Sequence, residues 1–382
     1  MDTATISETR TVELATGTLR LDVEHGPRID DLCDFAARAN PKRGFLIVSK
    51  VLGRHMPARP AQMRDTMARL AEQLDPTLPG PIMFLGMAET ATALGQGVFN
   101  AYVDQTGREW VSYIQTSRQE MPGASLLTSF EEGHSHATTH MVQIDSATMP
   151  FQVRNAASLV IVDDESSTGN TFLAAAKAMA AVMPNLQVIQ TVCITDWSGG
   201  RYLRDMPKPA TAVSRLAGQM SWTKGAEHQA PALPKGSNEA GMAPATAMNS
   251  RGGIMEEEKA ARPFACAAAG ERVLVLGDGE HSYEALRIAE EIEQQGGIAA
   301  VQCITRSPAL LGHAMQSVSL FDDSYGSGAP CYLYNILGHQ PDRIIIAAEK
   351  VGNQREMAMR ALEKLGASIP VELFECRYDG DA

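Results

Sequence analysis

Runs of branched apolar residues recur along the first half of the chain, and they alternate with stretches that suit helices. The runs are GFLIVSK at 44–50, PIMFLG at 81–86 and LVIV at 159–162. They are apolar throughout rather than alternating, which is typical of parallel strands covered on both faces. Alternation of such strands with helices predicts an α/β fold with a parallel sheet flanked by helices.

The segment after LVIV has the clearest helical pattern. Its apolar residues recur every three or four positions, and Pro184 follows the last of them. This spacing predicts a helix that packs one face on the sheet and ends before the proline. The apolar positions are Phe172, Leu173, Ala176, Met179 and Met183.

A second α/β block follows in the last third of the chain. Apolar strands are predicted at 272–280, 298–308 and 342–350, with a helix around 282–297 and another at the end. This alternation predicts a second, smaller α/β domain.

A change of composition separates the two blocks. The segment between them is dense in Gly, Pro, Ala, Met and Ser, which predicts a connection that is partly ordered. We therefore expect a first domain at 1–196, a linker at 197–268 and a second domain at 269–382.

The overall composition agrees with two folded domains. Of 382 residues, 44% are hydrophobic and 20% are charged, so substantial cores can form. The net charge of −12 argues against nonspecific nucleic-acid binding, which needs clustered Lys and Arg. No apolar run reaches the roughly 18 to 20 residues of a membrane span, and the first residues lack a signal-peptide pattern. Six cysteines without metal-ligand spacing suit a reducing compartment, so we expect a cytoplasmic protein with no membrane partner.

The stretch LVIVDDESSTGNTF at 159–172 carries the strongest chemical signal. A loop of glycine and hydroxyl residues between a parallel strand and a helix suits anions, because unpaired N–H groups and the helix dipole point at the ligand. The carboxylates of Asp163 and Asp164 can accept hydrogen bonds from a vicinal diol or face the water shell of a metal ion. A phosphate beside a diol describes a ribose 5-phosphate. The structural alternative is a solvated strand end with an ordinary helix cap.

The same stretch resembles the phosphoribosyl pyrophosphate loop of type I phosphoribosyltransferases. The resemblance implies a type I phosphoribosyltransferase fold with a hood, and it implies that Asp163 and Asp164 hold the ribose 2- and 3-hydroxyls. It also implies Mg²⁺ at these two carboxylates, held through water and substrate, and the 5-phosphate on residues 167–171. The substrate-binding residues implied in this loop are Ser166, Ser167, Thr168, Gly169, Asn170 and Thr171.

Residues 45–57 resemble the hood hairpin of the orotate phosphoribosyltransferase-like branch. In that hairpin a lysine, and a glycine followed by a basic residue, lie over the base and the pyrophosphate. The resemblance therefore implies that Lys50 acts in catalysis and that Arg54, which follows Gly53, contacts substrate.

The segment IMFLGMAETATALG at 82–95 stands where the family has its pyrophosphate loop, between a strand and a helix. The resemblance makes Ala88, Glu89 and Thr90 candidate ligands of pyrophosphate. A carboxylate such as Glu89 suits this position only if Mg²⁺ intervenes.

Residues 116–140 stand where the family has a flexible catalytic loop that closes over the site and excludes water. Arg118 is present, but EEGHSHATTH replaces the lysines of the orotate pattern, so the usual acceptor is in doubt. His134 and His136 become candidate substrate contacts. Together with His140 they also have a compact spacing that suits zinc, and a polar closing loop is the alternative.

The spacer of the phosphoribosyl loop departs from the family in a second way. Salvage enzymes for oxopurines usually have an acid just before Thr-Gly, whereas Ser167 stands there in this chain. The loop therefore does not supply a purine-type general base, and the acceptor stays open.

Polar residues also end two predicted neighbouring strands of the second block, where open α/β sheets bind ligands. Only two glycines of a GxGxxG pattern are present, so a dinucleotide site is weakly indicated. Arg306 can bind an anion or form a salt bridge with Asp278 or Glu280. The candidate ligand residues are Gly277, Asp278, Gly279, Glu280, Thr305, Arg306 and Ser307.

The second block resembles the TRSP domain that follows a phosphoribosyltransferase in proteins of bacterial tellurite-resistance and stress gene clusters. The resemblance rests on VLGDGEHSYEALRIAEEIEQQGG, VQCITRSP and DDSYGSGAPCYLYNI. It implies a role in making a nucleoside-like metabolite, with phosphoribosyl pyrophosphate and Mg²⁺ used to ribosylate a nitrogen of a base-like acceptor. It also suggests a homodimer.

Two other functions stay open from the sequence. A protein that senses phosphoribosyl pyrophosphate or a nucleotide without turnover would explain the missing loop lysines. Alternatively, the reaction runs backward and the TRSP block acts on what the first block makes.

Overall fold

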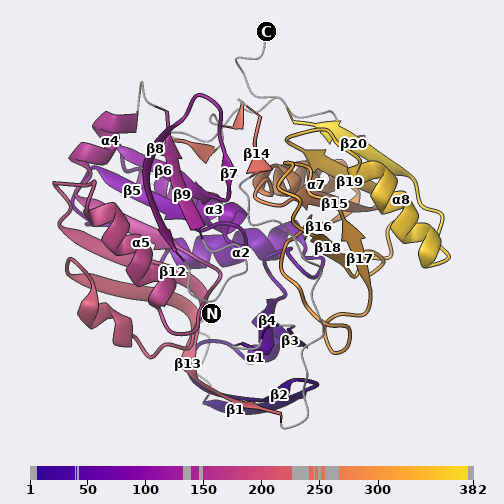
Figure 1. Ribbon diagram of the computed structural model, residues 1–382, viewed down its shortest axis with the longest axis horizontal. Helices are drawn as coiled ribbons and strands as arrows, with labels where there is room; N and C mark the ends of the chain where they lie inside the picture. Colours follow the sequence, from indigo (N-terminus) through magenta and orange to yellow (C-terminus); the bar gives the residue numbers. More distant parts are fainter. Residues whose placement is uncertain are drawn as a thin grey trace.

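The computed structural model describes residues 7–38, 40, 43–131, 139–145, 149–225, 241–244, 246–247, 251–253 and 266–376. Within these ranges the chain forms two open sheets, each covered by helices, that lie side by side (Figure 1). None of the helices in the described ranges is long and apolar enough to cross a membrane.

The first sheet has the strand order β1-β2-β13-β12-β10-β5-β6-β9-β8, with β11 paired to β12. Its centre is parallel, and every residue of β10 and β5 is buried, as the unbroken apolar runs predict. The strands are β1 (Glu8–Leu14), β2 (Gly17–His25), β5 (Ile82–Gly86), β6 (Val111–Ser117), β8 (Ser125–Glu131), β9 (Thr139–Ile144), β10 (Ser158–Val162), β11 (Glu165–Ser166), β12 (Val188–Asp196) and β13 (Ala210–Lys224).

Helices cover both faces of this sheet. The chain passes from β5 through α3 to β6 on one side, and from β10 through α5 to β12 on the other. Because such crossovers are right-handed, α3 and α5 lie on opposite faces. The point where the strand order reverses is therefore between β5 and β10. The helices of this half are α1 (Ile29–Leu32), α2 (Pro60–Ala71), α3 (Thr92–Thr106), α4 (Met149–Asn155), α5 (Asn170–Ala180) and the 3₁₀ turn η1 (Arg201–Asp205).

An antiparallel hairpin of β3 (Cys33–Ala37) and β4 (Phe45–Ser49) stands apart from the main sheet. We call it the hood hairpin. The apolar run at 44–50 lies in this hairpin and not in the parallel sheet. Its residues are buried from two sides. Phe45 and Ile47 join the core cluster of the first sheet, whereas Ala36 and Val48 join a cluster with Tyr334 of the second half.

The start of the expected linker is instead part of the first sheet. Strand β13 pairs parallel with β12 and antiparallel with β2, with a shift in register between Ala217 and Gly218. The first sheet therefore extends to Lys224, beyond residue 197, where the linker was expected to begin. Few positions of β13 are buried, Val213 and Leu216 among them, so the strand lacks the unbroken apolar run by which its neighbours were recognised.

The second sheet is parallel throughout and has the order β16-β15-β19-β20. An antiparallel hairpin, β17–β18, and a two-residue pair formed by β14 and β7 (Gln119–Glu120) lie beside it. The remaining elements are β14 (Gly241–Met242), β15 (Arg272–Asp278), α7 (Tyr283–Gln294), β16 (Ile298–Ile304), β17 (Val318–Phe321), β18 (Cys331–Tyr334), β19 (Arg343–Ala348), α8 (Gln354–Lys364) and β20 (Val371–Glu375).

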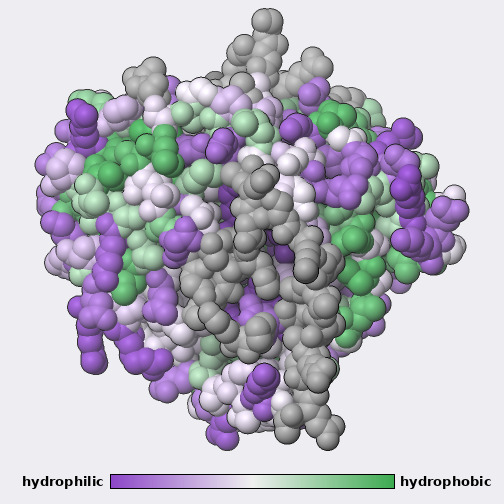
Figure 2. Space-filling model, in the orientation of Figure 1, coloured by the Kyte–Doolittle hydropathy of each residue, from purple (hydrophilic) through white to green (hydrophobic). Residues whose placement is uncertain are grey.

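The two halves share one apolar core. A continuous cluster runs from the first sheet through α2 and α3 to α7 and includes Leu286 and Ile288 of that helix. Gly53 has φ +67, and a Cβ at this position would lie 2.9 Å from the carbonyl oxygen of Val301, so the backbones meet closely here. On the surface in Figure 2, hydrophobic residues gather on each half separately, and the region between the halves is hydrophilic where grey atoms do not cover it.

Candidate active site

The candidate site lies where the order of the first sheet reverses. Strands β5 and β10 are parallel neighbours, with Gly86 beside Val162 at their carboxyl ends. The helices that follow these strands diverge to opposite faces, and open α/β sheets bind ligands in the crevice that this leaves. The predicted pyrophosphate loop follows β5 and the predicted ribose loop follows β10, so the fold brings the two together.

The two carboxylates of the ribose loop come directly after β10. The loop is attached to β12, because the N–H of Asp163 donates to the carbonyl of Val192 at 2.9 Å. The N–H of Asp164 donates to Asp163 Oδ1 at 2.9 Å. Burial raises the pKa of Asp164, although the Arg43 guanidinium opposes this shift. A partly buried carboxylate with a raised pKa favours a partner that donates hydrogen bonds or carries positive charge.

The phosphate end of the loop is shaped by Gly169. Its φ is +79, and a Cβ there would lie 2.0 Å from the ring of Tyr202. The N–H groups of Ser167, Thr168 and Gly169 have no partner within the described part of the chain. Helix α5 begins at the next residue, where the first N–H groups of any helix lack intrahelical acceptors. These donors suit a phosphate.

The hood hairpin is tied to the ribose loop through a charge pair. Arg43, just before β4, donates to Glu165 Oε1 at 2.6 Å, and both side chains are mostly buried. The Oγ of Ser166 is buried and has no hydrogen-bond partner in the described chain. The ribose loop thus has a hydroxyl without a described partner, Ser166 Oγ, next to Glu165, which Arg43 holds in place.

The first two N–H groups of the candidate pyrophosphate loop are hydrogen-bonded to the protein, and the next two have no described acceptor. Met87 N–H donates to the carbonyl of Val162 at 2.9 Å, and Ala88 N–H donates to Thr116 Oγ1 at 2.8 Å. The peptide bond between Ala88 and Glu89 is cis. No described residue accepts from the N–H groups of Glu89 and Thr90, so the loop offers two backbone donors to an anion.

The side chain of Glu89 contacts the second half of the chain. Its Oε1 accepts from Thr305 Oγ1 at 2.8 Å and from Arg306 N–H at 3.1 Å, and Arg54 lies 3.4 Å away. A buried carboxylate needs donors, and the second sheet supplies them. The role of Glu89 as a ligand of pyrophosphate stays a prediction.

The two hood cations are also engaged by protein groups. Arg54 is 2% exposed, and its guanidinium donates to the carbonyls of Gly279, at 2.6 Å, and Glu89. Lys50 Nζ donates to the carbonyl of Asp30 at 2.7 Å. Arg54 therefore joins the two halves of the chain, and its contact with substrate and the catalytic role of Lys50 stay predictions.

Arg118 lies at the end of β6 beside a buried histidine. Its guanidinium is 3.3 Å from His140 Nε2, and His140 Nδ1 is 2.9 Å from Thr116 Oγ1. The ring of His140 stacks on Phe130 with centroids 4.9 Å apart. Thr116 also holds Ala88, so Arg118 is connected to the candidate pyrophosphate loop through two side chains.

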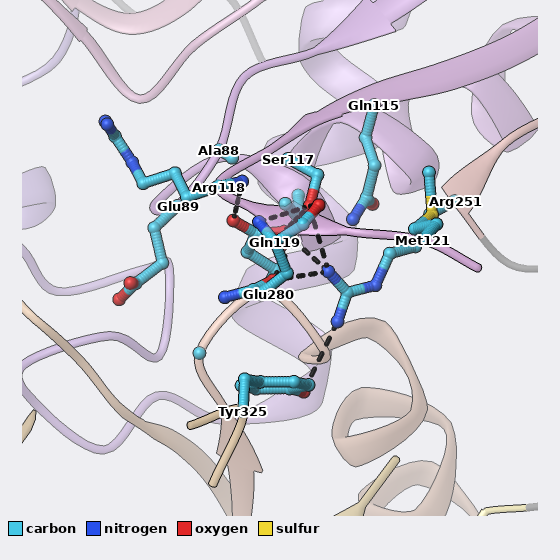
Figure 3. A network of polar contacts seen from close by, with 12 residues as sticks. Ala88, Glu89, Gln115, Ser117, Arg118, Gln119, Met121, Arg251, Glu280 and Tyr325 are labelled. Carbon is cyan, nitrogen blue, oxygen red and sulfur yellow. Dashed lines mark hydrogen bonds and ion pairs between the residues drawn. The ribbon is translucent and has the colours of Figure 1, made fainter. Parts of the chain in front are cut away.

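Glu280 of the second half reaches the same strand end. Its Oε2 accepts from Ser117 Oγ at 2.7 Å, and its Oε1 accepts from Arg118 N–H at 2.6 Å (Figure 3). Arg251 Nη1 donates to Glu280 at 2.6 Å and to Gln119 Oε1 at 2.7 Å. This network is buried, and it joins the strand ends of both sheets.

The GDGE turn at 277–280 differs from the phosphate loop at 167–169. Asp278 and His281 exchange backbone hydrogen bonds of 3.0 Å, and Gly279 N–H donates to the carbonyl of Ile304. These N–H groups are occupied, so the turn is a tight connection and does not resemble a phosphate cradle. A dinucleotide site here is not supported.

The other predicted ligands of the second sheet have protein partners. Asp278 accepts from Ser324 at 2.6 Å and from Gln354 at 2.9 Å. Arg306 pairs with Asp323 at 3.1 Å, and not with Asp278 or Glu280 as the salt-bridge alternative had it. Gly277, Gly279 and Ser307 lie at the same strand ends, where β15 and β16 are neighbours as expected.

Comparison with known proteins decides the family. A family model described as phosphoribosyl transferase matches residues 32–225, which is half of the chain. The chain belongs to the phosphoribosyltransferase family. A second model, for the TRSP domain at the C terminus of this transferase, matches residues 241–365. The protein is thus a pentosyltransferase by family, with a TRSP domain attached. No curated protein matches the chain.

Solved structures similar to the chain are themselves phosphoribosyltransferases. Adenine phosphoribosyltransferase from Rhodothermus marinus is 15% identical over 49% of this chain and 97% of its own, with a TM-score of 0.33. The Trypanosoma brucei enzyme, solved with AMP, pyrophosphate and ribose-5-phosphate, is 14% identical over 49% and 77%, with a TM-score of 0.33. Hypoxanthine phosphoribosyltransferase from Trypanosoma cruzi is 13% identical over 42% and 77%, with a TM-score of 0.26. At these TM-scores the family assignment rests on the family model alone.

The described residues contain no group of three or more His, Cys, Asp or Glu side chains placed to hold a metal ion. The donor set still suits Mg²⁺ held partly by substrate, because Asp163 and Asp164 offer adjacent carboxylates and Mg²⁺ usually keeps several waters. His134 and His136 lie outside the described residues.

Sequence reasoning missed the residues that join the two domains. Arg251 lies in a segment read as a linker, and its partner Glu349 follows the last apolar run of β19. Tyr325 completes the group, with its ring under the Arg251 guanidinium. A charged residue in a low-complexity segment gives no periodic signal, so the sequence pattern could not have found Arg251.

Proposed function

We propose that the protein transfers the phosphoribosyl group of phosphoribosyl pyrophosphate to a nitrogen atom of a base-like acceptor, with Mg²⁺. The observation that supports this most is the pairing of two loops at the switch point of the first sheet. One loop presents two carboxylates and three N–H groups without an acceptor among the described residues, and the other presents the N–H groups of Glu89 and Thr90, which likewise lack one there.

The chemistry assigned to the chain is mainly positioning and charge stabilisation. Asp163 and Asp164 would accept the ribose hydroxyls, while residues 167–171 would hold the 5-phosphate. The two N–H groups at 89–90 and the Arg118 guanidinium would stabilise the negative charge that develops on the departing pyrophosphate. A bound Mg²⁺ would neutralise part of the same charge. A nucleophilic nitrogen then forms the new bond to ribose C1 as the C1–O bond to pyrophosphate breaks.

Calorimetry with Mg²⁺ and phosphoribosyl pyrophosphate tests the proposal. Wild-type protein should bind it, and a variant carrying both Asp163→Asn and Asp164→Asn should lose most of that affinity, because two amides cannot replace two carboxylate acceptors. Asp65→Asn is a matched control, since Asp65 lies on α2 and pairs with Arg69 at the surface. Absence of binding by the wild-type protein would overturn the proposal.

A second candidate function is sensing without turnover. The protein contacts of Glu89 and Arg54 favour it, because these two side chains were expected to bind pyrophosphate and are engaged by the TRSP domain. Incubation with labelled phosphoribosyl pyrophosphate and a pool of small metabolites separates the two functions. Release of pyrophosphate with a new ribosylated mass supports the transferase, whereas binding without either product supports the sensor.

The acceptor class and biological role extend the same proposal. A nucleoside-like product made in the cytoplasm would agree with the resemblance to stress and tellurite-resistance clusters. Ser167, at the position where oxopurine salvage enzymes have an acid, argues against that acceptor class. A homodimer is a further prediction, which light scattering of the full chain would check.

A further inference from the structure

We propose that the TRSP domain positions the pyrophosphate end of the transferase site, with Glu280 and Thr305 as positioning residues. This inference rests on the proposed function. It assigns the strand ends of the TRSP sheet to the transferase reaction instead of to a ligand of their own.

The first contact is at the candidate pyrophosphate loop. Thr305 and the N–H of Arg306 donate to the carboxylate of Glu89, and this residue supplies one of the two unpaired backbone N–H groups. The side chains of Glu89 and Thr305 are buried. A hydrogen bond to the side chain therefore limits the rotation of the peptide that must face the anion.

The second contact is at the end of β6. Glu280 accepts from Ser117 Oγ and from the N–H of Arg118, at 2.7 and 2.6 Å. The same strand end carries Thr116, which holds Ala88 N–H at 2.8 Å. Glu280 thus fixes the end of β6. This strand end carries Arg118 and also Thr116, which holds the pyrophosphate loop.

The two contacts come from neighbouring strands of one sheet. Asp278, two residues before Glu280, is beside Ile304 in the parallel register of β15 and β16. Because the strands are hydrogen-bonded to each other, the distance between Glu280 and Thr305 is set by the TRSP sheet. The sheet acts as a rigid spacer between the loops that follow β5 and β6.

Among the described residues, the ribose end of the site has no comparable contact with the TRSP domain. The loop at 163–169 is held by β12, by Tyr202 and by Arg43, all within the transferase domain. We therefore expect the two ligands to respond differently. Loss of the TRSP contacts should weaken pyrophosphate binding and leave ribose 5-phosphate binding unchanged.

Calorimetry with two separate probes, Mg²⁺-pyrophosphate and ribose 5-phosphate, tests this difference on the full chain. Thr305→Val removes the hydroxyl donor at nearly constant volume, and we expect pyrophosphate to bind about three- to tenfold more weakly. Thr305→Ser retains the hydroxyl and should restore most of the affinity. Glu280→Gln places an NH₂ group against at least one N–H or O–H donor, and we expect a loss of about tenfold or more.

Glu290→Gln is the matched control. Glu290 is also a TRSP carboxylate that crosses the domain interface, where it pairs with Arg64 at 2.6 Å, but it lies on α7 away from the two loops. This variant should bind both probes as the wild-type protein does.

Three outcomes distinguish the possibilities. Weaker pyrophosphate binding with unchanged ribose 5-phosphate binding in Thr305→Val and Glu280→Gln supports the inference. Equal weakening of both probes, or wild-type affinity for pyrophosphate in both variants, overturns it. If the wild-type protein binds ribose 5-phosphate and pyrophosphate but not phosphoribosyl pyrophosphate, the proposed function fails instead.

Discussion

Replacement of Arg251 by methionine tests how strongly the two domains depend on each other. The Arg251 side chain is 2% exposed, and the side chains of Glu280 and Glu349 are 0% exposed. Methionine fills similar space but donates no hydrogen bonds. The change therefore leaves two buried carboxylates without their shared cation, together with the acceptor oxygen of Gln119.

Removing one member of a buried ion pair costs about 3–5 kcal/mol, because the remaining charge stays desolvated. That is a large part of the roughly 5–15 kcal/mol that holds a folded protein together. We expect Arg251→Met to lower the free energy of unfolding by about 3–5 kcal/mol at pH 7, with most of the loss at the domain interface.

The loss should depend on pH with a definite sign. Burial acts to raise the pKa of Glu349, but the Arg251 guanidinium holds it below its usual value, so this pair stabilises the fold above the unfolded pKa of about 4.3. The stabilisation disappears as the pH falls through the folded pKa. Burial raises the pKa of Glu280 even in the presence of Arg251. Without the cation both carboxyls would be protonated more readily, so the difference from wild type should shrink towards pH 4.

Urea unfolding at several pH values measures both effects. Arg64→Met is the control, because the Arg64–Glu290 pair is about one-third exposed and should contribute no more than about 1 kcal/mol. A loss of less than 1 kcal/mol for Arg251→Met at pH 7, or a loss that grows towards pH 4, would refute the reasoning.

Three further predictions concern the ribose loop and the thiols. Gly169→Ala should weaken ribose 5-phosphate binding about tenfold or more, because φ +79 costs a non-glycine residue about 1–2 kcal/mol and the added Cβ meets the Tyr202 ring; calorimetry showing wild-type affinity would contradict this. Affinity for phosphoribosyl pyrophosphate should fall as the pH drops through the raised pKa of Asp164, because the protonated acid loses acceptor capacity; a Kd that stays constant down to about pH 4, near the usual pKa of an aspartate, would exclude it. Iodoacetamide should label native protein mainly at Cys266, the exposed cysteine of the described chain, and Cys266→Ser should remove the fast phase seen by mass spectrometry.

The fold could be predicted where apolar pattern and burial agree. Strands β5 and β10 are buried on both faces and read as unbroken apolar runs, and α7 follows its predicted range closely. The pattern failed at β13, a strand with few buried positions, and at β4, which is buried between the two halves of the chain but pairs with β3 and not with the parallel sheet. Burial alone does not say which partner covers a strand.

Only those groups of the candidate site that are close together in the sequence could be predicted. Asp163, Asp164 and the N–H groups at 167–169 are neighbours in sequence, so one motif places them all. Glu89 and Arg54 were assigned to substrate because their segments resemble substrate loops. Their side chains instead meet residues more than 200 positions away, and no spacing within a segment could reveal such contacts.

The GDGE turn illustrates why a ligand edge and an interface are hard to tell apart in sequence. Both need glycine where backbones approach closely, and both gather polar side chains at the carboxyl ends of parallel strands. The difference is in the backbone donors. At 167–169 they have no acceptor in the described part of the chain, as an anion site requires. The N–H groups of Asp278, Gly279 and His281 are instead bonded to protein carbonyls, and the Gly279 carbonyl accepts from Arg54. An edge whose donors are satisfied in this way suits contact with another part of the chain, which is why we propose that the TRSP strand ends support the transferase site.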